Sequence, residues 1–183
     1  MIATPAVIKR IEEIVQSKVN EWRPIYGPKE IPEHPATPKP YSGTTITLRG
    51  NENEPIRLLQ PLQGDIDDVS VLWIPSQRTL ITGDLVYSGN QHVWLKEVRQ
   101  KSDRDDWIES VRCGVIGGHV PVGVKPRVTD MQSTIDYIEF FDNYVFGRGY
   151  SAQEISEIIK RQYPDRLAPL LLNITAETYG QKY

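Results

Sequence analysis

Two side chains with metal-binding chemistry follow apolar stretches of this sequence. Asp84 comes directly after the strand-turn run 71–83, and His119 comes directly after the run 115–118. Each run ends in glycine and has the composition of a buried strand, so both side chains are expected at the carboxyl ends of strands. A carboxylate and an imidazole are ordinary zinc ligands, but a catalytic zinc normally has three protein ligands. The pair therefore predicts at most an incomplete metal centre.

Each of these residues also has an ordinary structural interpretation. Asp84 could accept backbone amides in a turn, and His119 could be a hydrogen-bonded loop histidine. The single cysteine, Cys113, has apolar neighbours and is expected to be structural rather than a nucleophile. With one cysteine, neither an internal disulfide nor a cysteine metal cluster can form.

The composition describes one globular domain and excludes several classes of protein. Of the 183 residues, 39% are hydrophobic and 25% are charged, which is enough to build a sizeable core. The net charge of -3 comes without a basic stripe, so neither nucleic acid nor an anionic membrane is an expected partner. No apolar run approaches the length of a bilayer span and no signal peptide is recognised, so a cytoplasmic location is expected.

Periodicity and capping predict the elements that must position these side chains. An amphipathic helix should begin at Pro5 with Thr4 as its cap, followed by a proline-rich arm over 24–40 that forms neither helix nor inner strand. Short strands are expected over 44–48, 56–60, 69–74 and 79–82. Further helices are expected after caps at Asp103 and Ser151, from Thr129 to Gly147, and from about Leu167 to Tyr179. This order predicts an α+β or layered αβ domain.

Three segments together resemble the carboxyl-terminal half of the metallo-β-lactamase superfamily. They are Thr82-Gly83-Asp84-Leu85-Val86-Tyr87, His92-Val93-Trp94-Leu95 and Ile116-Gly117-Gly118-His119-Val120-Pro121. The start, Ala3-Thr4-Pro5 followed by a helix, is similar to the segment after the first ligand motif of complete members. The resemblance implies a partial αββα sandwich with an antiparallel-rich sheet and helices on one side. Residues 1–183 would form a single domain, incomplete at its N-terminal side, with 151–183 as a helical extension.

The same resemblance implies a set of metal ligands and a substrate contact. Asp84 would bridge two metals and His119 would bind the second, while the motif H-x-H-x-D-H is absent from this chain. The middle histidine would fall on Asp65 or, with a longer turn, on Gln63. Asp65 could bind a metal through oxygen, as carboxylates suit harder cations, or could belong to a solvated turn. His92 resembles a substrate-facing position, although a histidine near an aromatic residue often packs instead.

Zinc is therefore expected to bind weakly or not at all. Without the missing ligands, Asp84 would be a partly buried carboxylate with little positive charge nearby. The preferred interpretation is a truncated or degenerate metallohydrolase-like protein with weak or no activity and a structural or binding role. One alternative is an active metal-dependent hydrolase of lactones, esters, thioesters or β-lactams whose site a partner chain completes. The other is a small-molecule binding module that uses the old cleft.

A partner is also expected from the missing layer of the sandwich. A sheet without its second layer would present an apolar face or an unpaired edge to water. Twofold pairing is the commonest way to bury such a surface, so the sequence predicts a homodimer. The proline-rich arm over 24–40 is a candidate for wrapping the second subunit.

Overall fold

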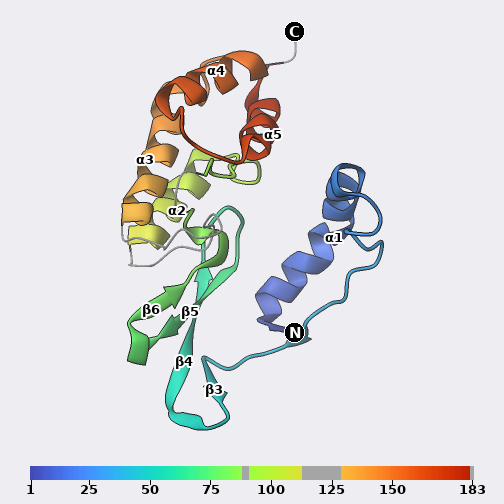
Figure 1. The fold of residues 1–183 in the computed structure, drawn as a ribbon, viewed down its shortest axis with the longest axis vertical. Helices are drawn as coiled ribbons and strands as arrows, with labels where there is room; N and C mark the ends of the chain where they lie inside the picture. Colours follow the sequence, from blue (N-terminus) through green and yellow to red (C-terminus); the bar gives the residue numbers. More distant parts are fainter. Residues whose placement is uncertain (88–90, 113–128, 182–183) are drawn as a thin grey trace.

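The computed structural model describes residues 1–87, 91–112 and 129–181, and an antiparallel sheet lies at its centre (Figure 1). The strands follow one another in chain order: β3 Thr45–Leu48, β4 Asn51–Leu62, β5 Val69–Ile74 and β6 Thr79–Ile81. The predicted meander and the α+β class are confirmed. Strand β4 begins earlier than expected, because Gly50 takes a φ of 85° and reverses the chain tightly between Leu48 and its partner Asn51.

Both faces of this sheet carry apolar side chains. Directly paired residues share a face, so Leu58, Leu72 and Ile81 lie on one side, which we call the outer face. Val71 and Leu80 lie on the opposite side, where they are 0% and 4% exposed. Ile81 is 50% exposed, so the outer face is covered only in part. Strands that are apolar on both faces are typical of a sheet packed between two layers.

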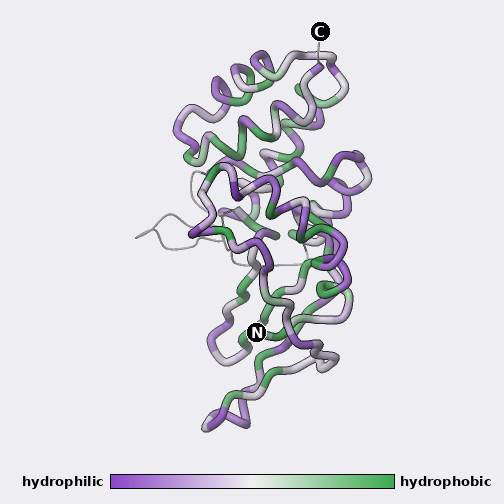
Figure 2. Tube along the Cα trace, turned by 90° about the vertical axis from the view of Figure 1, so that its right-hand side faces the viewer, coloured by the Kyte–Doolittle hydropathy of each residue, from purple (hydrophilic) through white to green (hydrophobic). Residues whose placement is uncertain are grey.

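Four helices gather at one end of the sheet, and a fifth lies beside it (Figure 1). The group consists of α2 Lys101–Arg112, α3 Thr129–Tyr144, α4 Ala152–Gln162 and α5 Pro169–Tyr179. Hydrophobic and hydrophilic residues alternate along them, as amphipathic helices require (Figure 2). Fully buried Trp107 anchors α2 and donates from its indole nitrogen to the Leu85 carbonyl over 2.8 Å. Within the described ranges, no helix combines the length and apolar composition that crossing a bilayer requires.

The helix caps predicted at Thr4 and Ser151 are confirmed. The cap predicted at Asp103 is wrong, because α2 begins at Lys101 and Asp103 lies inside its first turn, where its carboxylate accepts from the Gln100 amide. Thr4 accepts a hydrogen bond from the Val7 amide at the start of α1 Pro5–Tyr26. Ser151 and Glu154 form the expected capping box at the start of α4. These side chains satisfy amides that a helix leaves without intrahelical partners. Helix α5 begins at Pro169, two residues later than expected, because Ala168 takes a left-handed conformation with a φ of 60°.

The proline-rich arm departs from the prediction at both ends. Pro24 lies inside α1, which continues to Tyr26. Pro40 belongs to β2 Lys39–Pro40, which pairs in parallel with β1 Ile2–Ala3. The pairing tolerates proline because its hydrogen bonds come from the neighbouring amides, Lys39 to Met1 and Tyr41 to Ala3. Residues 28–38 between these ends contain neither helix nor strand, as expected.

Charged side chains connect α1 to the rest of the molecule. Arg10 pairs with Asp67 in the loop between β4 and β5. Lys18 and Glu21 pair with Glu97 and Lys96, respectively, in the segment before α2. Trp22 adds an aromatic contact with Trp94, with ring centroids 5.5 Å apart. The helix is therefore held along its length while space remains between its apolar side and the sheet.

Candidate functional site

A short helical turn after β6 presents Asp84 to solvent. The turn, η2 Gly83–Leu85, begins at a glycine with a φ of 52° and ends at fully buried Leu85. Leu85 fixes the backbone in the core, so the preceding side chain points outward and Asp84 is exposed. The expectation of a partly buried carboxylate is therefore wrong. Exposure keeps the Asp84 charge in water and removes the need for a neutralising metal.

The loop between β4 and β5 brings Asp65 to the same place. Gly64 before it is buried, and a side chain there would approach the Val69 methyl group at 2.9 Å. Asp65 follows this glycine and is half-buried. Burial raises the pKa of Tyr87, and the charges of Asp65 and Asp84 raise it further. Both carboxylates therefore lie near one phenol.

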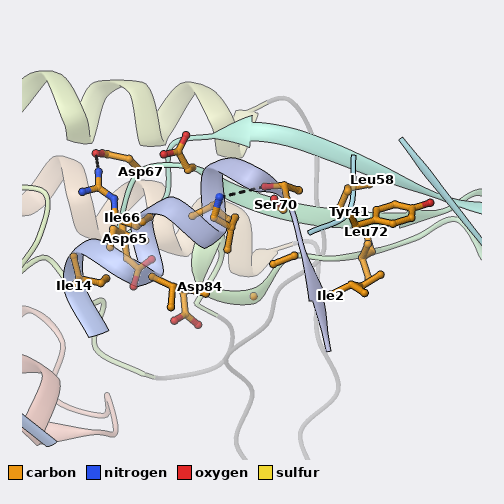
Figure 3. A pocket seen from close by; sticks show the side chains of 18 of the residues that line it. Ile2, Ile14, Tyr41, Leu58, Asp65, Ile66, Asp67, Ser70, Leu72 and Asp84 are labelled. Carbon is orange, nitrogen blue, oxygen red and sulfur yellow. Dashed lines mark hydrogen bonds and ion pairs between the residues drawn. The ribbon is translucent and has the colours of Figure 1, made fainter. Parts of the chain in front are cut away.

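Asp65 and Asp84 line one end of a cavity of about 580 Å³ between α1 and the outer face, which we call the α1 pocket (Figure 3). Helix α1 contributes Val7, Ile11 and Ile14 to its wall. The sheet contributes Ile46, Leu58 and Leu72. Two further carboxylates, Asp67 and Asp68, and one cation, Arg10, also line it. Among the residues that the structure describes, the lining of the α1 pocket thus combines apolar side chains with four carboxylates and one cation.

Two polar atoms in this wall lack a hydrogen-bond partner among the described residues. They are the Ser70 hydroxyl oxygen and the Arg10 Nε, and both are shielded from solvent. The terminal nitrogens of Arg10 do have partners, Asp67 and Glu13. A buried polar atom without a partner costs free energy, so each of these atoms marks a place where a hydrogen-bonding group would be stabilised.

The side chains of the α1 pocket that could ligate a metal do not fit zinc. Its ionisable ligand groups are carboxylates, and its lining contains neither histidine nor cysteine among the residues that the structure describes. No group of three or more histidine, cysteine, aspartate or glutamate side chains capable of holding a metal occurs within 1–87, 91–112 and 129–181. Zinc favours nitrogen and sulfur ligands, whereas carboxylate oxygens suit harder cations. His119 lies outside the described residues, and its role as a ligand stays a prediction.

His92 lies among the helices and away from the α1 pocket. It is 2% exposed, and its Nδ1 lies 3.1 Å from the Tyr137 hydroxyl oxygen. Its backbone amide donates to the Leu167 carbonyl over 3.0 Å. Burial, together with the positive charges of Arg166 and Lys160, lowers the pKa of His92 to about 4. These contacts give His92 a packing role, and its contact with a substrate stays a prediction.

Sequence reasoning missed Arg10 and Ser70 as members of the site. A signal for each exists in the sequence. Arg10 occurs within the apolar stripe of α1, three residues after Val7 and four before Ile14. Ser70 stands between valines in a strand that is otherwise apolar. A polar residue on a face that should be apolar often indicates a site or a buried hydrogen bond.

Two solved structures are similar to this chain over part of its length. TMB-1, described in connection with substrate and inhibitor binding, is 18% identical with a TM-score of 0.49, covering 78% of this chain and 57% of that one. The DIM-1 metallo-β-lactamase exposed to ceftazidime is 20% identical with a TM-score of 0.43, covering 75% of this chain and 66% of that one. This chain thus spans less than two thirds of either protein. No protein-family model and no curated protein matches the sequence.

Both similar structures are metallo-β-lactamases, the superfamily that the sequence resembles. At these identities and TM-scores the likeness assigns this chain neither a family nor an activity.

Proposed function

We propose that this chain is a metallo-β-lactamase-like protein with weak or no hydrolytic activity, and that it binds a small molecule in the α1 pocket. The observation that carries this proposal is the α1 pocket itself, an apolar cavity of about 580 Å³ with Asp65 and Asp84 at its edge. Sites for small molecules typically occupy about 300–1000 Å³ and combine apolar walls with a few polar groups. The α1 pocket has both properties.

The small number of candidate metal ligands in this chain supports weak or absent hydrolytic activity. Zinc-assisted hydrolysis needs an ion held firmly enough to acidify its bound water, with one coordination position open. Asp65, Asp84 and His119 together would supply three ligands, which is the number that one catalytic zinc needs and too few for two. A two-metal centre, which the superfamily resemblance implies, therefore needs ligands from another source.

We expect the purified protein to retain little zinc after dialysis and to hydrolyse lactone, ester, thioester and β-lactam substrates no faster than buffer. Metal analysis and initial-rate measurements test this. Asp84→Ala should change neither result, and Asp105→Ala, at an exposed carboxylate of α2, is the matched control. Stoichiometric zinc together with turnover that is lost in Asp84→Ala would overturn the proposal. Turnover that rises with the square of protein concentration would favour a site completed by a partner chain.

A homodimer is the second part of the proposal. The half-covered outer face supports it, because Ile81 is 50% exposed beside paired Leu72. Exposed apolar surface on a sheet favours association, and twofold pairing closes it. We expect Ile81→Lys to convert a dimer into a monomer in light scattering at micromolar concentration. Leu59→Lys, 41% exposed on the opposite face, should remain dimeric. A monomeric parent protein would contradict the dimer.

A further inference from the structure

We propose that α1 is a lid over the α1 pocket, and that ion pairs which salt weakens hold this lid closed. The inference rests on the proposed small-molecule function and names the regulation of that same site. Three observations carry it: the shallow burial of α1, the space beneath the helix, and the charged contacts that attach it to the rest of the chain. A ligand enters when α1 moves away from the outer face.

Helix α1 has fewer buried side chains than any other helix in the part of the chain that the structure describes. Val19, at 5% exposed, is the buried residue among its 22. Helices α2 to α5 are each shorter, and each has at least two buried side chains. Segments with few buried apolar contacts open locally at a lower free energy than the core does. We therefore expect α1 to separate from the sheet before the other helices unfold.

The space beneath α1 accounts for this shallow burial. Val7, Ile11 and Ile14 of the helix line the α1 pocket and are half-buried. Leu58 and Leu72 of the outer face line the same pocket and are also half-buried (Figure 3). A cavity of about 580 Å³ leaves part of both apolar surfaces without a packing partner. A ligand that fills the cavity contacts both surfaces and so stabilises the closed position of α1.

Charged contacts attach α1 to the rest of the chain. Three ion pairs join the helix to the loop between β4 and β5 and to the segment before α2, and we call them the ionic latch. Their side chains are 19–55% exposed, so dissolved salt can screen the charges. The pairs of the ionic latch are Arg10 with Asp67, Lys18 with Glu97, and Glu21 with Lys96. Trp22 and Trp94 add an aromatic contact that salt does not screen.

The segments that follow α1 allow the helix to move. Strand β1 ends just before α1 begins, and it pairs with β2, so this small sheet should move with the start of the helix. Residues 28–38 and 41–44 lie on either side of β2 and contain neither helix nor strand. They can therefore absorb a change in direction between α1 and the main sheet. Figure 1 shows α1 beside that sheet and apart from the group of four helices, which its movement would leave in place.

Hydrogen exchange of the α1 amides measures the opening directly. On the full chain, we expect α1 to exchange about tenfold faster in about 1 M than in about 0.05 M NaCl, and α3 to exchange equally in both. Lys18→Gln with Lys96→Gln removes two cations of the ionic latch, and neither residue lines the α1 pocket. This double variant should show the fast exchange of α1 already at low salt. Lys101→Gln, which removes an exposed lysine paired with Asp105 within α2, is the matched control and should behave as the parent protein does.

Nile red, a neutral apolar dye that fluoresces more strongly out of water, tests the link between opening and binding. Bound dye should slow the exchange of α1 at low salt, because it contacts both the helix and the outer face. Its association rate in stopped-flow fluorescence at low salt should be about tenfold higher for the double variant than for the parent protein. A neutral dye is not steered by the charges that the variant removes. Circular dichroism confirms that each variant is folded.

The outcomes distinguish this inference from the proposed function. Dye binding together with α1 exchange that responds neither to salt nor to the two lysines overturns the ionic latch and leaves the α1 pocket in place. Salt-dependent opening of α1 without dye binding supports the ionic latch and overturns the binding role. Equal association rates for the parent protein and the double variant overturn the lid, because entry would then not require α1 to move.

Discussion

Replacing Arg104 by alanine is expected to lower the free energy of unfolding by about 3–5 kcal/mol, because it leaves a buried carboxylate without its cation. Arg104 is fully buried in α2, and its Nε donates to Asp142 Oδ1 over 2.5 Å. The Asp142 side chain is 7% exposed, so water cannot replace the lost partner. Urea or guanidinium unfolding measured at neutral pH tests the expected loss.

Further contacts of Arg104 add to this expectation. Its Nη1 donates to the Val98 carbonyl over 2.6 Å, and its guanidinium carbon lies 4.1 Å from the centre of the Phe146 ring. Tyr179 also donates to the Val98 carbonyl, over 2.8 Å. Arg104 therefore joins α2 and α3 to the segment before α2 and to α5. Alanine would remove every contact that Arg104 makes, while the hydrogen bond from Tyr179 to Val98 does not involve this side chain.

Because the partner of Arg104 is the Asp142 carboxylate, the stability lost in Arg104→Ala should depend on pH. Burial raises the pKa of Asp142, and the Arg104 guanidinium opposes that rise. Without Arg104, the carboxyl group should take up a proton more readily, and the penalty for burying its charge then disappears. The destabilisation caused by Arg104→Ala should therefore be larger at neutral pH than in mild acid. An effect that is independent of pH would contradict the role of the charge.

Two variants separate the ion pair from a general loss of packing. Arg112→Ala removes an arginine from the same helix, but its partners Glu109 and Glu139 are exposed, so the change should cost less than about 1 kcal/mol. Arg104→Met combined with Asp142→Leu replaces both charges by apolar groups and should recover most of the stability lost in Arg104→Ala. A double variant as unstable as Arg104→Ala would indicate that packing, not charge, dominates.

Local signals in the sequence were sufficient to predict most of the elements. Thr4-Pro5 and the capping box at Ser151 locate two helix starts because the hydrogen bonds that make a cap lie within a few residues. Apolar runs separated by turns locate the four strands of the meander for the same reason. Proline misled the prediction at Pro24 and Pro40, where the tertiary arrangement tolerates a missing amide donor. The parallel pairing of β1 with β2 joins distant segments, and no local pattern predicts it.

The site was harder to predict because its members come from separate elements. Motif resemblance named Asp65 and Asp84, and both line the α1 pocket, while their role as metal ligands stays a prediction. It could not predict that Asp84 is exposed, because exposure depends on how buried Leu85 fixes the preceding turn. The apolar cavity itself lies between α1 and the outer face, and it depends on how far apart these two elements lie. Periodicity predicts which side of a helix is apolar but not how far that side lies from a sheet.

Lowering the pH from about 6.5 to about 4 is expected to remove stability that depends on neutral His92. The pKa of His92 is lowered from 6.5 to about 4, chiefly by its burial. Between these two pH values the histidine is therefore protonated in the unfolded chain and neutral in the folded chain. The free energy of unfolding must then rise with pH between about 4 and about 6.5. The part that depends on neutral His92 is complete above about 6.5 and is lost as the pH falls to about 4. At about 1.4 kcal/mol per pKa unit, the full effect is about 3 kcal/mol.

The surroundings of His92 explain why protonation is unfavourable. Arg166 stacks on Tyr137 with its guanidinium carbon 4.7 Å from the ring centre, and Tyr137 in turn contacts the His92 ring. A charged imidazole would therefore be buried beside a cation that is fixed by hydrogen bonds to Gln91 and Ser133. The buried imidazole cannot reach solvent without disrupting its packing against Tyr137 of α3.

Comparison with two variants isolates this contribution from the carboxylates that also titrate in acid. His92→Gln removes the titrating ring, so its free energy of unfolding should fall less steeply between pH 6.5 and 4 than that of the parent protein. His34→Gln changes an exposed histidine and should leave the parent slope unaltered. Chemical unfolding at several pH values measures both slopes. Equal slopes for the parent protein and His92→Gln would show that this histidine takes up its proton as easily in the folded chain as in the unfolded one.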